Sequence, residues 1–341
     1  MKLNITFLIG NGFDLNLGMK TRYTDMYDSY INSESSNEVI AKFKEDLKKD
    51  EHKHYENWSD FEMGMAFYAR NFSNESDFVA CIRDFKTHMV RWLKNEEVEF
   101  GKTTLSNNIL GNEMVNSIAN FHSGSTPNVK YTIEDVIFQE NHCDCNFITF
   151  NYTFALDAII ARTSKLFNAN QMNYIIHEPI HIHGDLTKDV VLGVDNKEQI
   201  NSFFRTTRKT ELAFIKPKFN QVYDYRRVNK AIDLINNSCI ICTYGFSFGK
   251  SDETWIRALK NWILADEQNH LICYIYDDKI FPSYNYDERI EREEELKETI
   301  FEKMKFTYEQ VETVRDKIHV PVSYSIFNFI EKTRTDELVA V

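Results

Sequence analysis

The sequence contains no run of about 20 apolar residues, which is the length that a membrane-spanning helix needs. Residues 3–10 form a short apolar run, but Asn11 interrupts it, and no small-residue cleavage site follows as it would in a secretory signal. The sequence therefore predicts neither a membrane span nor a secretory signal. We expect a cytoplasmic protein of bacterial type.

An excess of positive charge is also missing, because 40 lysine and arginine residues stand against 52 aspartate and glutamate residues, a formal net charge of -12. Binding to nucleic acid in general needs a basic surface that releases counterions from phosphates. We therefore expect no general nucleic-acid binding and favour a small-molecule partner. The six cysteines follow no regular spacing, as is typical of reduced thiols in a cytosol.

The sequence does contain apolar strands that alternate with amphipathic helices. Helical segments, around residues 221–237 and 252–264, separate the later predicted strands. Strands that are apolar on both faces and alternate with helices are typical of a parallel sheet. The predicted fold class is α/β, with a Rossmann-like, mostly parallel sheet and helices on both faces. The predicted strands are residues 3–9, 147–150, 174–176, 180–183, 190–193, 239–244 and 271–276.

A helical block interrupts this alternation after the first strand. Apolar residues recur three or four apart over 39–47 and 78–92, which indicates helices. The stretch 101–131 is rich in Ser, Asn and Gly and predicts a loop-rich return to the sheet. The predicted division is a Rossmann-like core at residues 1–24 and 132–341 with a mainly helical insertion at 25–131.

Glycines follow the first predicted strand. Gly10 and Gly12 would let the backbone approach a pyrophosphate, although Leu15 stands where a G-x-G-x-x-G pattern has its third glycine. A G-x-G alone is also common in tight turns. The hypothesis is that this loop contacts a nucleotide through Gly10, Asn11, Gly12, Phe13 and Asp14.

Asn151 stands where the strand at 147–150 should end. Asn151 or Thr153 could cap the helix that follows, since both side chains accept amide hydrogen bonds well at that position. Alternatively, Asn151 could hold a ribose hydroxyl or a water beside the anomeric carbon. The sequence leaves both interpretations open.

Two histidines lie near the end of the strand at 180–183. Residues two apart on a strand share a face, so His181 and His183 could point the same way. His183 could act as a general base, because imidazole titrates near about pH 6.5, or it could be structural. His181, His183 and Asp185 could also begin a metal site of hydrolase type, but no further carboxylate–histidine set completes it, and we expect no metal.

The strand at 239–244 also runs into glycine and serine. Gly245 and Ser247 are candidates for ligand contact, whereas Ser251 and Asp252 are explained as a helix cap and a charge that favours the helix dipole. In an open α/β sheet, ligands bind beyond the carboxyl ends of the strands. Four strand ends of this composition therefore predict one crevice, wide enough for a dinucleotide.

The same motifs resemble those of the AbiH family, which is associated with bacterial abortive infection, in which a cell halts itself to stop phage spread. The resemblance runs from residue 5 to about 255. It implies antiphage defence with an unknown phage trigger, and it leaves a homo-oligomer open. The segments that carry it are residues 9–15, 58–62, 150–153, 183–185 and 244–249.

AbiH proteins in turn resemble sirtuins in the order of their motifs. This resemblance implies that Asn151 and His183 correspond to the sirtuin catalytic pair. It also implies that the loops of Gly10, Gly12, Gly245 and Ser247 contact NAD. Thr153 and Asp14 depart from the sirtuin pattern, and the paired C-x-x-C zinc ribbon is missing, which argues against a protein deacylase.

The resulting hypothesis is hydrolysis of NAD at the nicotinamide–ribose bond, with Asn151 and His183 as catalytic residues. Positive charge develops on the ribose in such a reaction, as in glycoside hydrolysis. The alternatives are a nucleotide sensor without turnover and a metal-dependent hydrolase or nuclease. A role for Glu62 is open, because Ser59 and Glu62 also form a capping box.

Overall fold

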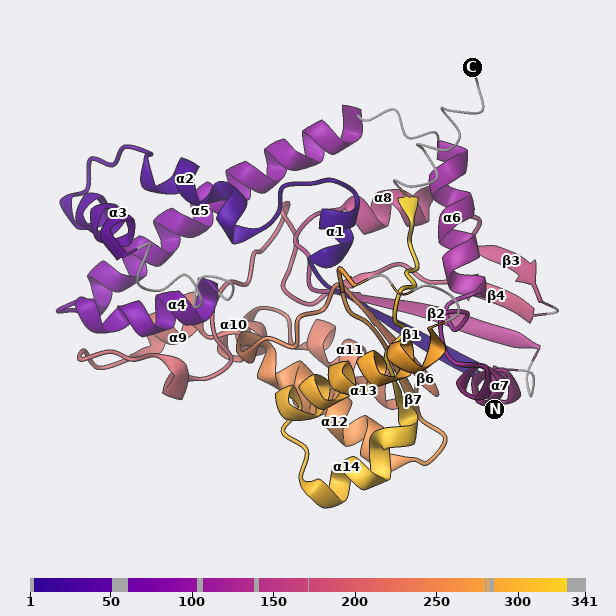
Figure 1. Cartoon of the computed structure of the whole chain (residues 1–341). Helices are drawn as coiled ribbons and strands as arrows, with labels where there is room; N and C mark the ends of the chain where they lie inside the picture. The colour runs from indigo at the N-terminus through magenta and orange to yellow at the C-terminus, as the bar shows by residue number, and fades with distance from the viewer. Residues whose placement is uncertain are drawn as a thin grey trace.

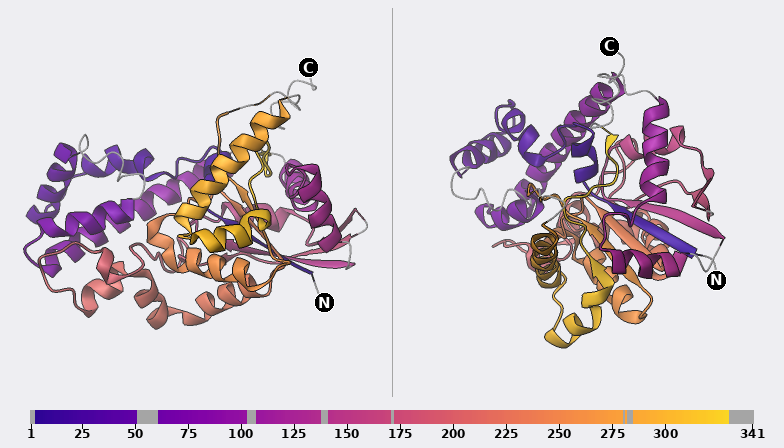
Figure 2. Two further views of the ribbon diagram at one scale, coloured as in Figure 1. Left: turned by 60° about the horizontal axis from the view of Figure 1, so that its bottom comes forward. Right: turned by 45° about the vertical axis from the view of Figure 1, so that its right-hand side comes forward.

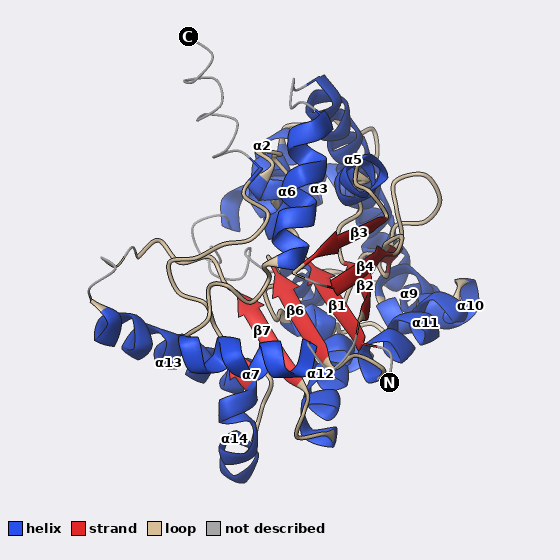
Figure 3. Ribbon diagram, turned by 90° about the vertical axis from the view of Figure 1, so that its right-hand side faces the viewer, coloured by secondary structure: helices blue, strands red, loops and turns tan. Residues whose placement is uncertain are grey.

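One sheet lies at the centre of the protein, whose computed structural model describes residues 3–50, 61–102, 107–137, 141–170, 172–279, 281 and 285–329. The strand order is β3-β4-β2-β1-β6-β7-β8, and β5 pairs with the last residues of β2. Every neighbouring pair is parallel except β3 and β4, which confirms the predicted α/β, Rossmann-like class (Figure 3). The strands are β1 (Leu3–Ile9), β2 (His142–Thr149), β3 (Leu166–Ala169), β4 (Met172–Ile176), β5 (Ile180–His181), β6 (Ile240–Tyr244), β7 (His270–Tyr274) and β8 (Ile318–His319).

The strand β1 lies in the middle of the sheet because it is apolar on both faces. On one face, Phe7 stacks on Phe147 of β2 with ring centroids 5.1 Å apart. On the other face, Leu8 belongs to a separate apolar cluster. Strands of a parallel sheet need this double-sided burial, since helices cover both faces.

Helices cover both faces of the sheet (Figure 1). On the Phe7 face pack α1 (Gly12–Asn16), α6 (Asn107–Ala119), α7 (Pro127–Ile137) and α8 (Ala155–Arg162). On the Leu8 face pack α11 (Tyr225–Asn236), α12 (Glu253–Ala265), α13 (Tyr286–Lys303) and α14 (Tyr308–Val314). Short 3-10 helices are η2 (Ala69–Asn71), η3 (Lys197–Gln199), η4 (Lys250–Asp252) and η5 (Arg315–Lys317). None of the described helices is long and apolar enough to cross a membrane.

A helical lobe stands beside the sheet and has its own apolar core. Figure 2 shows these helices in indigo and purple, with the salmon segment that includes α9 beneath them. Residues 186–215, which follow β5, also contribute to the core of the lobe. The lobe helices are α2 (Tyr23–Ile31), α3 (Glu38–Asp50), α4 (Phe61–Tyr68), α5 (Glu75–Lys102) and α9 (Arg208–Phe214), and α10 (Lys216–Tyr223) follows α9.

The prediction of a loop-rich return at 101–131 is wrong, because α6 and the start of α7 lie there. Leu110, Met114 and Ile118 are spaced four apart and are buried against the sheet. A Cβ at Gly111 would lie 2.7 Å from the carbonyl oxygen of Arg162, so glycine allows α6 to approach the end of α8. Residues 107–119 and 127–131 are therefore helical, whereas residues 120–126 form the turn between α6 and α7. The predicted domain boundaries stay a prediction.

The predicted strand at 190–193 is also wrong, since only an isolated bridge joins Val190 to Gly184 there. This segment is apolar because Val190 and Leu192 belong to the core of the lobe. The other predicted strands are present with shifted ends, and the edge strands β3 and β8 had not been predicted.

Candidate functional site

The loops after β1 and β6 contact each other backbone to backbone at the carboxyl edge of the sheet. Gly10 N–H donates to the carbonyl of Tyr244 at 2.9 Å, and Gly12 N–H donates to the carbonyl of Gly245 at 3.2 Å. A Cβ at Gly12 would lie 2.5 Å from Gly245 Cα, and Gly245 has a φ of 64°. The glycines therefore allow the two loops to touch, and the amides of Gly10 and Gly12 already have partners.

The other residues predicted to contact a nucleotide through these loops have varied surroundings. The Asn11 carboxamide accepts a 2.6 Å hydrogen bond from the Thr21 hydroxyl and donates to the Thr21 carbonyl. Phe13 is buried, with its ring 5.5 Å from that of Phe327. Ser247 is exposed, and its carbonyl accepts a hydrogen bond from the Lys303 amine.

Asp14 is buried and joins the start of the chain to the end of β2. Its Oδ1 accepts from Asn151 Nδ2 at 2.8 Å, and its Oδ2 accepts from the Thr153 hydroxyl at 2.6 Å. Burial raises the pKa of Asp14 to about 6, although these two hydrogen bonds favour the carboxylate. The interpretation of Asn151 or Thr153 as a helix cap is wrong, because α8 follows Phe154, whose N–H donates to Glu97 of α5 at 2.6 Å.

His181 fixes the backbone beside Asn151. Its Nδ1 lies 3.1 Å from the Asn151 carbonyl, and its Nε2 lies 2.8 Å from Asp157 Oδ2. Burial by itself would lower the pKa of His181, but the hydrogen bond and the charge of Asp157 raise it. The ring is therefore held between a carbonyl and a carboxylate.

His183 faces a buried cluster of charged residues. Its Nε2 lies 3.0 Å from Asp252 Oδ1, at an angle that makes no well-directed hydrogen bond. Lys216 Nζ lies 3.0 Å from the same oxygen and 2.7 Å from Glu62 Oε2. The other oxygen of Glu62 accepts from Gly193 N–H at 3.0 Å. Four charged or titratable side chains thus meet from α4, α10, η4 and the residues after β5.

Burial and mutual charge set the protonation of this cluster. Burial and the Lys216 charge lower the pKa of His183, so its imidazole is neutral near pH 7. Burial would raise the pKa of Asp252, but the Lys216 charge lowers it well below the usual range. Burial raises the pKa of Glu62 above its usual range, although the charge of Lys216 favours the carboxylate. The result is a neutral histidine next to an ionised carboxylate.

The residues considered for a metal site have separate partners. His181 contacts Asp157, whereas His183 faces Asp252. Asp185 Oδ1 accepts hydrogen bonds from its own turn, at Thr187 and Lys188. Within the described residues, no three His, Cys, Asp or Glu side chains are grouped as metal ligands. The geometry therefore gives no support to the metal-dependent alternative.

Asn151 and His183 lie close to one another, although their side chains point to different partners. The residues on either side of Asn151 pack on the His183 ring, Phe150 at 5.4 Å and Tyr152 at 6.3 Å between ring centroids. The Asn151 amide donates to Asp14, whereas the His183 imidazole faces Asp252. The ends of β1, β2, β5 and β6 do meet at one edge.

Sequence reasoning missed Lys216 altogether and explained Asp252 only as a helix-dipole charge. The sequence holds one local indication, because Lys216 directly follows the apolar pair Phe214-Ile215, and such a pair is typical of a buried segment. Glu62 was named with an open role, and it proves to be buried against Lys216. Trp58, Ser59 and Asp60 of the same box lie outside the described residues.

The chain is similar to a known protein family. A family model described as "Bacteriophage abortive infection AbiH" matches residues 6–274. This range is well over half of the chain, and it includes Glu62, His183, Lys216 and Asp252. No curated protein matches the chain.

Proposed function

The chain belongs to the AbiH family and so to bacteriophage abortive infection, and on this premise we propose that it acts by binding NAD and hydrolysing the nicotinamide–ribose bond. One observation carries the proposal: a neutral, buried His183 lies 3.0 Å from an ionised Asp252 at the carboxyl edge of the sheet. A histidine beside a carboxylate is the arrangement that general-base catalysis uses.

The reaction needs one proton acceptor. A water oxygen bonds to the anomeric carbon of the ribose, the carbon–nitrogen bond breaks, and its electron pair leaves with nicotinamide, which becomes neutral. The proton that the water loses passes to His183. The transition state carries positive charge on the ribose. Asp14 and Asp252 lie at the same edge of the sheet, and their carboxylates supply negative charge that stabilises this transition state.

Asn151 would orient the water or a ribose hydroxyl. Its Nδ2 is fixed by Asp14 at 2.8 Å. Its Oδ1 accepts no hydrogen bond from the described residues and is not shut off from solvent. A carboxamide that is fixed at its nitrogen and open at its oxygen is preorganised to accept a hydrogen bond.

The test uses purified protein, NAD and mass spectrometry of released nicotinamide. Asn151→Ala and His183→Ala should each slow release by about 100-fold or more, whereas His142→Gln, an exposed histidine at the start of β2, should match wild type. Because the pKa of His183 is lowered, the wild-type rate should fall only below about pH 6.5. Equal rates in all four proteins would overturn the proposal.

A second candidate, a nucleotide sensor without turnover, is favoured by the burial of His183. This residue is only 4% exposed, and binding without turnover would need no access of water to its imidazole. A sensor would show a rise in melting temperature with NAD while nicotinamide stayed bonded. Mass spectrometry of the same samples separates the two candidates.

A further inference from the structure

A hollow lies away from the candidate site, toward the amino ends of the strands. Its volume is about 560 Å³, which is within the range of small-molecule sites. Tyr174 of β4 lines it and pairs with Cys143 near the start of β2. The last residue of β2, Thr149, is six residues further on, about 20 Å of extended strand. The hollow is therefore separate from the site at the carboxyl edge.

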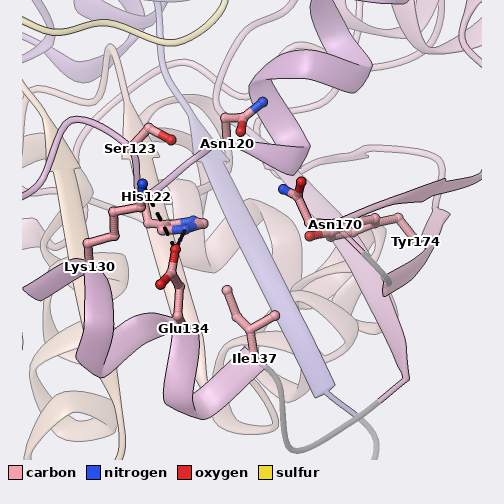
Figure 4. Close-up of a pocket in the computed structure, with 8 residues that line it drawn as sticks. All are labelled: Asn120, His122, Ser123, Lys130, Glu134, Ile137, Asn170 and Tyr174. Atoms are coloured by element: carbon pink, nitrogen blue, oxygen red, sulfur yellow. Dashed lines mark hydrogen bonds and ion pairs between the residues drawn. The ribbon is translucent and has the colours of Figure 1, made fainter.

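One wall of the hollow carries a cation, an anion and a histidine (Figure 4). His122 Nε2 lies 3.4 Å from Glu134 Oε1, and Lys130 Nζ lies 4.0 Å from the same oxygen. Burial lowers the pKa of His122, so the ring is neutral near pH 7. The charges of Lys130 and Glu134 cancel, and the wall has no net charge.

The opposite wall carries neutral polar groups, Asn170 and Tyr174 (Figure 4). Tyr174 is 1% exposed, and its ring stacks on Phe167 with centroids 4.9 Å apart. Its hydroxyl has no hydrogen-bond partner among the described residues, and it is not shut off from the hollow. A hydroxyl that is accessible and has no protein partner can donate to a polar ligand or accept from one. Asn170 donates only a long, 3.4 Å hydrogen bond to the Ala119 carbonyl.

We propose that this hollow binds an uncharged ring that carries several hydroxyl groups, either the ribose of a nucleoside or a free sugar. Hydroxyl groups both donate and accept, so they can donate to Glu134 and the Asn170 oxygen and accept from the Tyr174 hydroxyl. A phosphate or a polyamine would find no net opposite charge on the wall. The proposal does not depend on NAD hydrolysis at the other edge.

The experiment is titration calorimetry of the full chain with adenosine, uridine, ribose and glucose, and with AMP as the charged comparison. Tyr174→Phe keeps the stacked ring and removes only the hydroxyl, so it should weaken binding by about five-fold. Glu134→Gln should weaken it as well. Tyr308→Phe alters an exposed tyrosine on α14 and should leave binding unchanged.

The panel distinguishes the two sources of such a ring. Binding of adenosine and uridine but not of ribose or glucose would identify a nucleoside, and binding of all four would identify a sugar site. AMP that binds far more tightly than adenosine would overturn the proposal, as would the absence of binding by every uncharged compound. Binding that Asn151→Ala abolishes and Tyr174→Phe leaves unchanged belongs to the other site and would also overturn it.

Discussion

Among single residues, Lys216 has the most unusual surroundings. Its side chain is 5% exposed and lies between the carboxylates of Glu62 and Asp252. Removing a charge from water costs several kcal/mol, and only good pairing offsets this cost. Two carboxylates around one lysine keep Lys216 charged, because their combined charge outweighs the effect of burial on its pKa. The cluster therefore depends on the lysine.

Lys216→Met should lower the free energy of unfolding by about 3–5 kcal/mol, because it leaves two carboxylates buried without their cation. Urea denaturation at pH 7 measures this loss. Lys188→Met changes an exposed lysine and should stay within about 0.5 kcal/mol of wild type. A loss at Lys216 as small as that at Lys188 would mean that the cluster does not need the charge.

Asp14 predicts a pH-dependent stability, since burial raises its folded pKa from 3.8 to about 6. Between these pH values the folded state holds the proton more tightly than the unfolded state does, so stability falls as pH rises. Asp14→Asn removes this titration. The free energy of unfolding of the variant, relative to wild type, should therefore increase by about 2–3 kcal/mol between pH 4 and 7.

Denaturation at a series of pH values measures this difference. Thr153→Val removes a hydrogen bond that favours the carboxylate, so it should raise the pKa of Asp14 further and steepen the pH-dependence. A pH-independent difference between Asp14→Asn and wild type would show that Asp14 does not titrate in this range.

At the scale of elements, the loops that follow β1 and β6 contact each other, and this contact explains why glycines are present in both loops. The two strands are neighbours in the sheet, so the loops that follow them emerge side by side. Gly12 N–H donates to the Gly245 carbonyl, and no side chain fits between the two backbones. The G-x-G motif therefore has a structural role, whether or not a nucleotide binds beside it.

Gly12→Ala should lower the free energy of unfolding by about 1–3 kcal/mol, because its Cβ would lie 2.5 Å from Gly245 Cα. Thermal and urea denaturation without ligand measure the loss. Gly101→Ala is the matched control, since no atom lies within 4 Å of its Cβ and it lies in α5, where alanine is favoured. If Gly12→Ala proved as stable as wild type, the glycine would serve ligand approach alone.

At the scale of the whole molecule, the charged cluster joins the lobe to the sheet. Glu62 comes from α4 of the lobe, whereas Asp252 precedes α12 on the sheet. Residues 186–215 leave β5 and enter the core of the lobe, so the chain itself crosses between the two parts. The lobe and the sheet should therefore unfold together.

The wild-type chain should show one unfolding transition, with the same midpoint by near-ultraviolet and far-ultraviolet circular dichroism. Glu62→Ala removes the link to Lys216 and the acceptor of Gly193 N–H, so the two midpoints should separate. Glu34→Ala, an exposed glutamate before α3, should keep them together. Separate midpoints in wild type would show that the protein does not unfold as one unit.

The sequence by itself determined the α/β class and most strand positions, because the spacing of apolar residues along one segment reports how that segment is buried. It also determined which polar residues stand at strand ends, among them Asn151 and His183, since a strand's end is a local feature. Sequence resemblance likewise pointed to the AbiH family, to which the match over residues 6–274 assigns the chain.

Only the tertiary structure decided the partners of these residues. Asn151 bonds to Asp14, which is 137 positions away, and Lys216 pairs with Glu62, 154 positions away. Such pairs depend on the order of strands in the sheet and on where the lobe packs, and neither leaves a periodic trace in the sequence. An aspartate that precedes a helix has the same sequence neighbours whether it is exposed or belongs to a buried cluster. Only the fold shows that Asp252 pairs with Lys216.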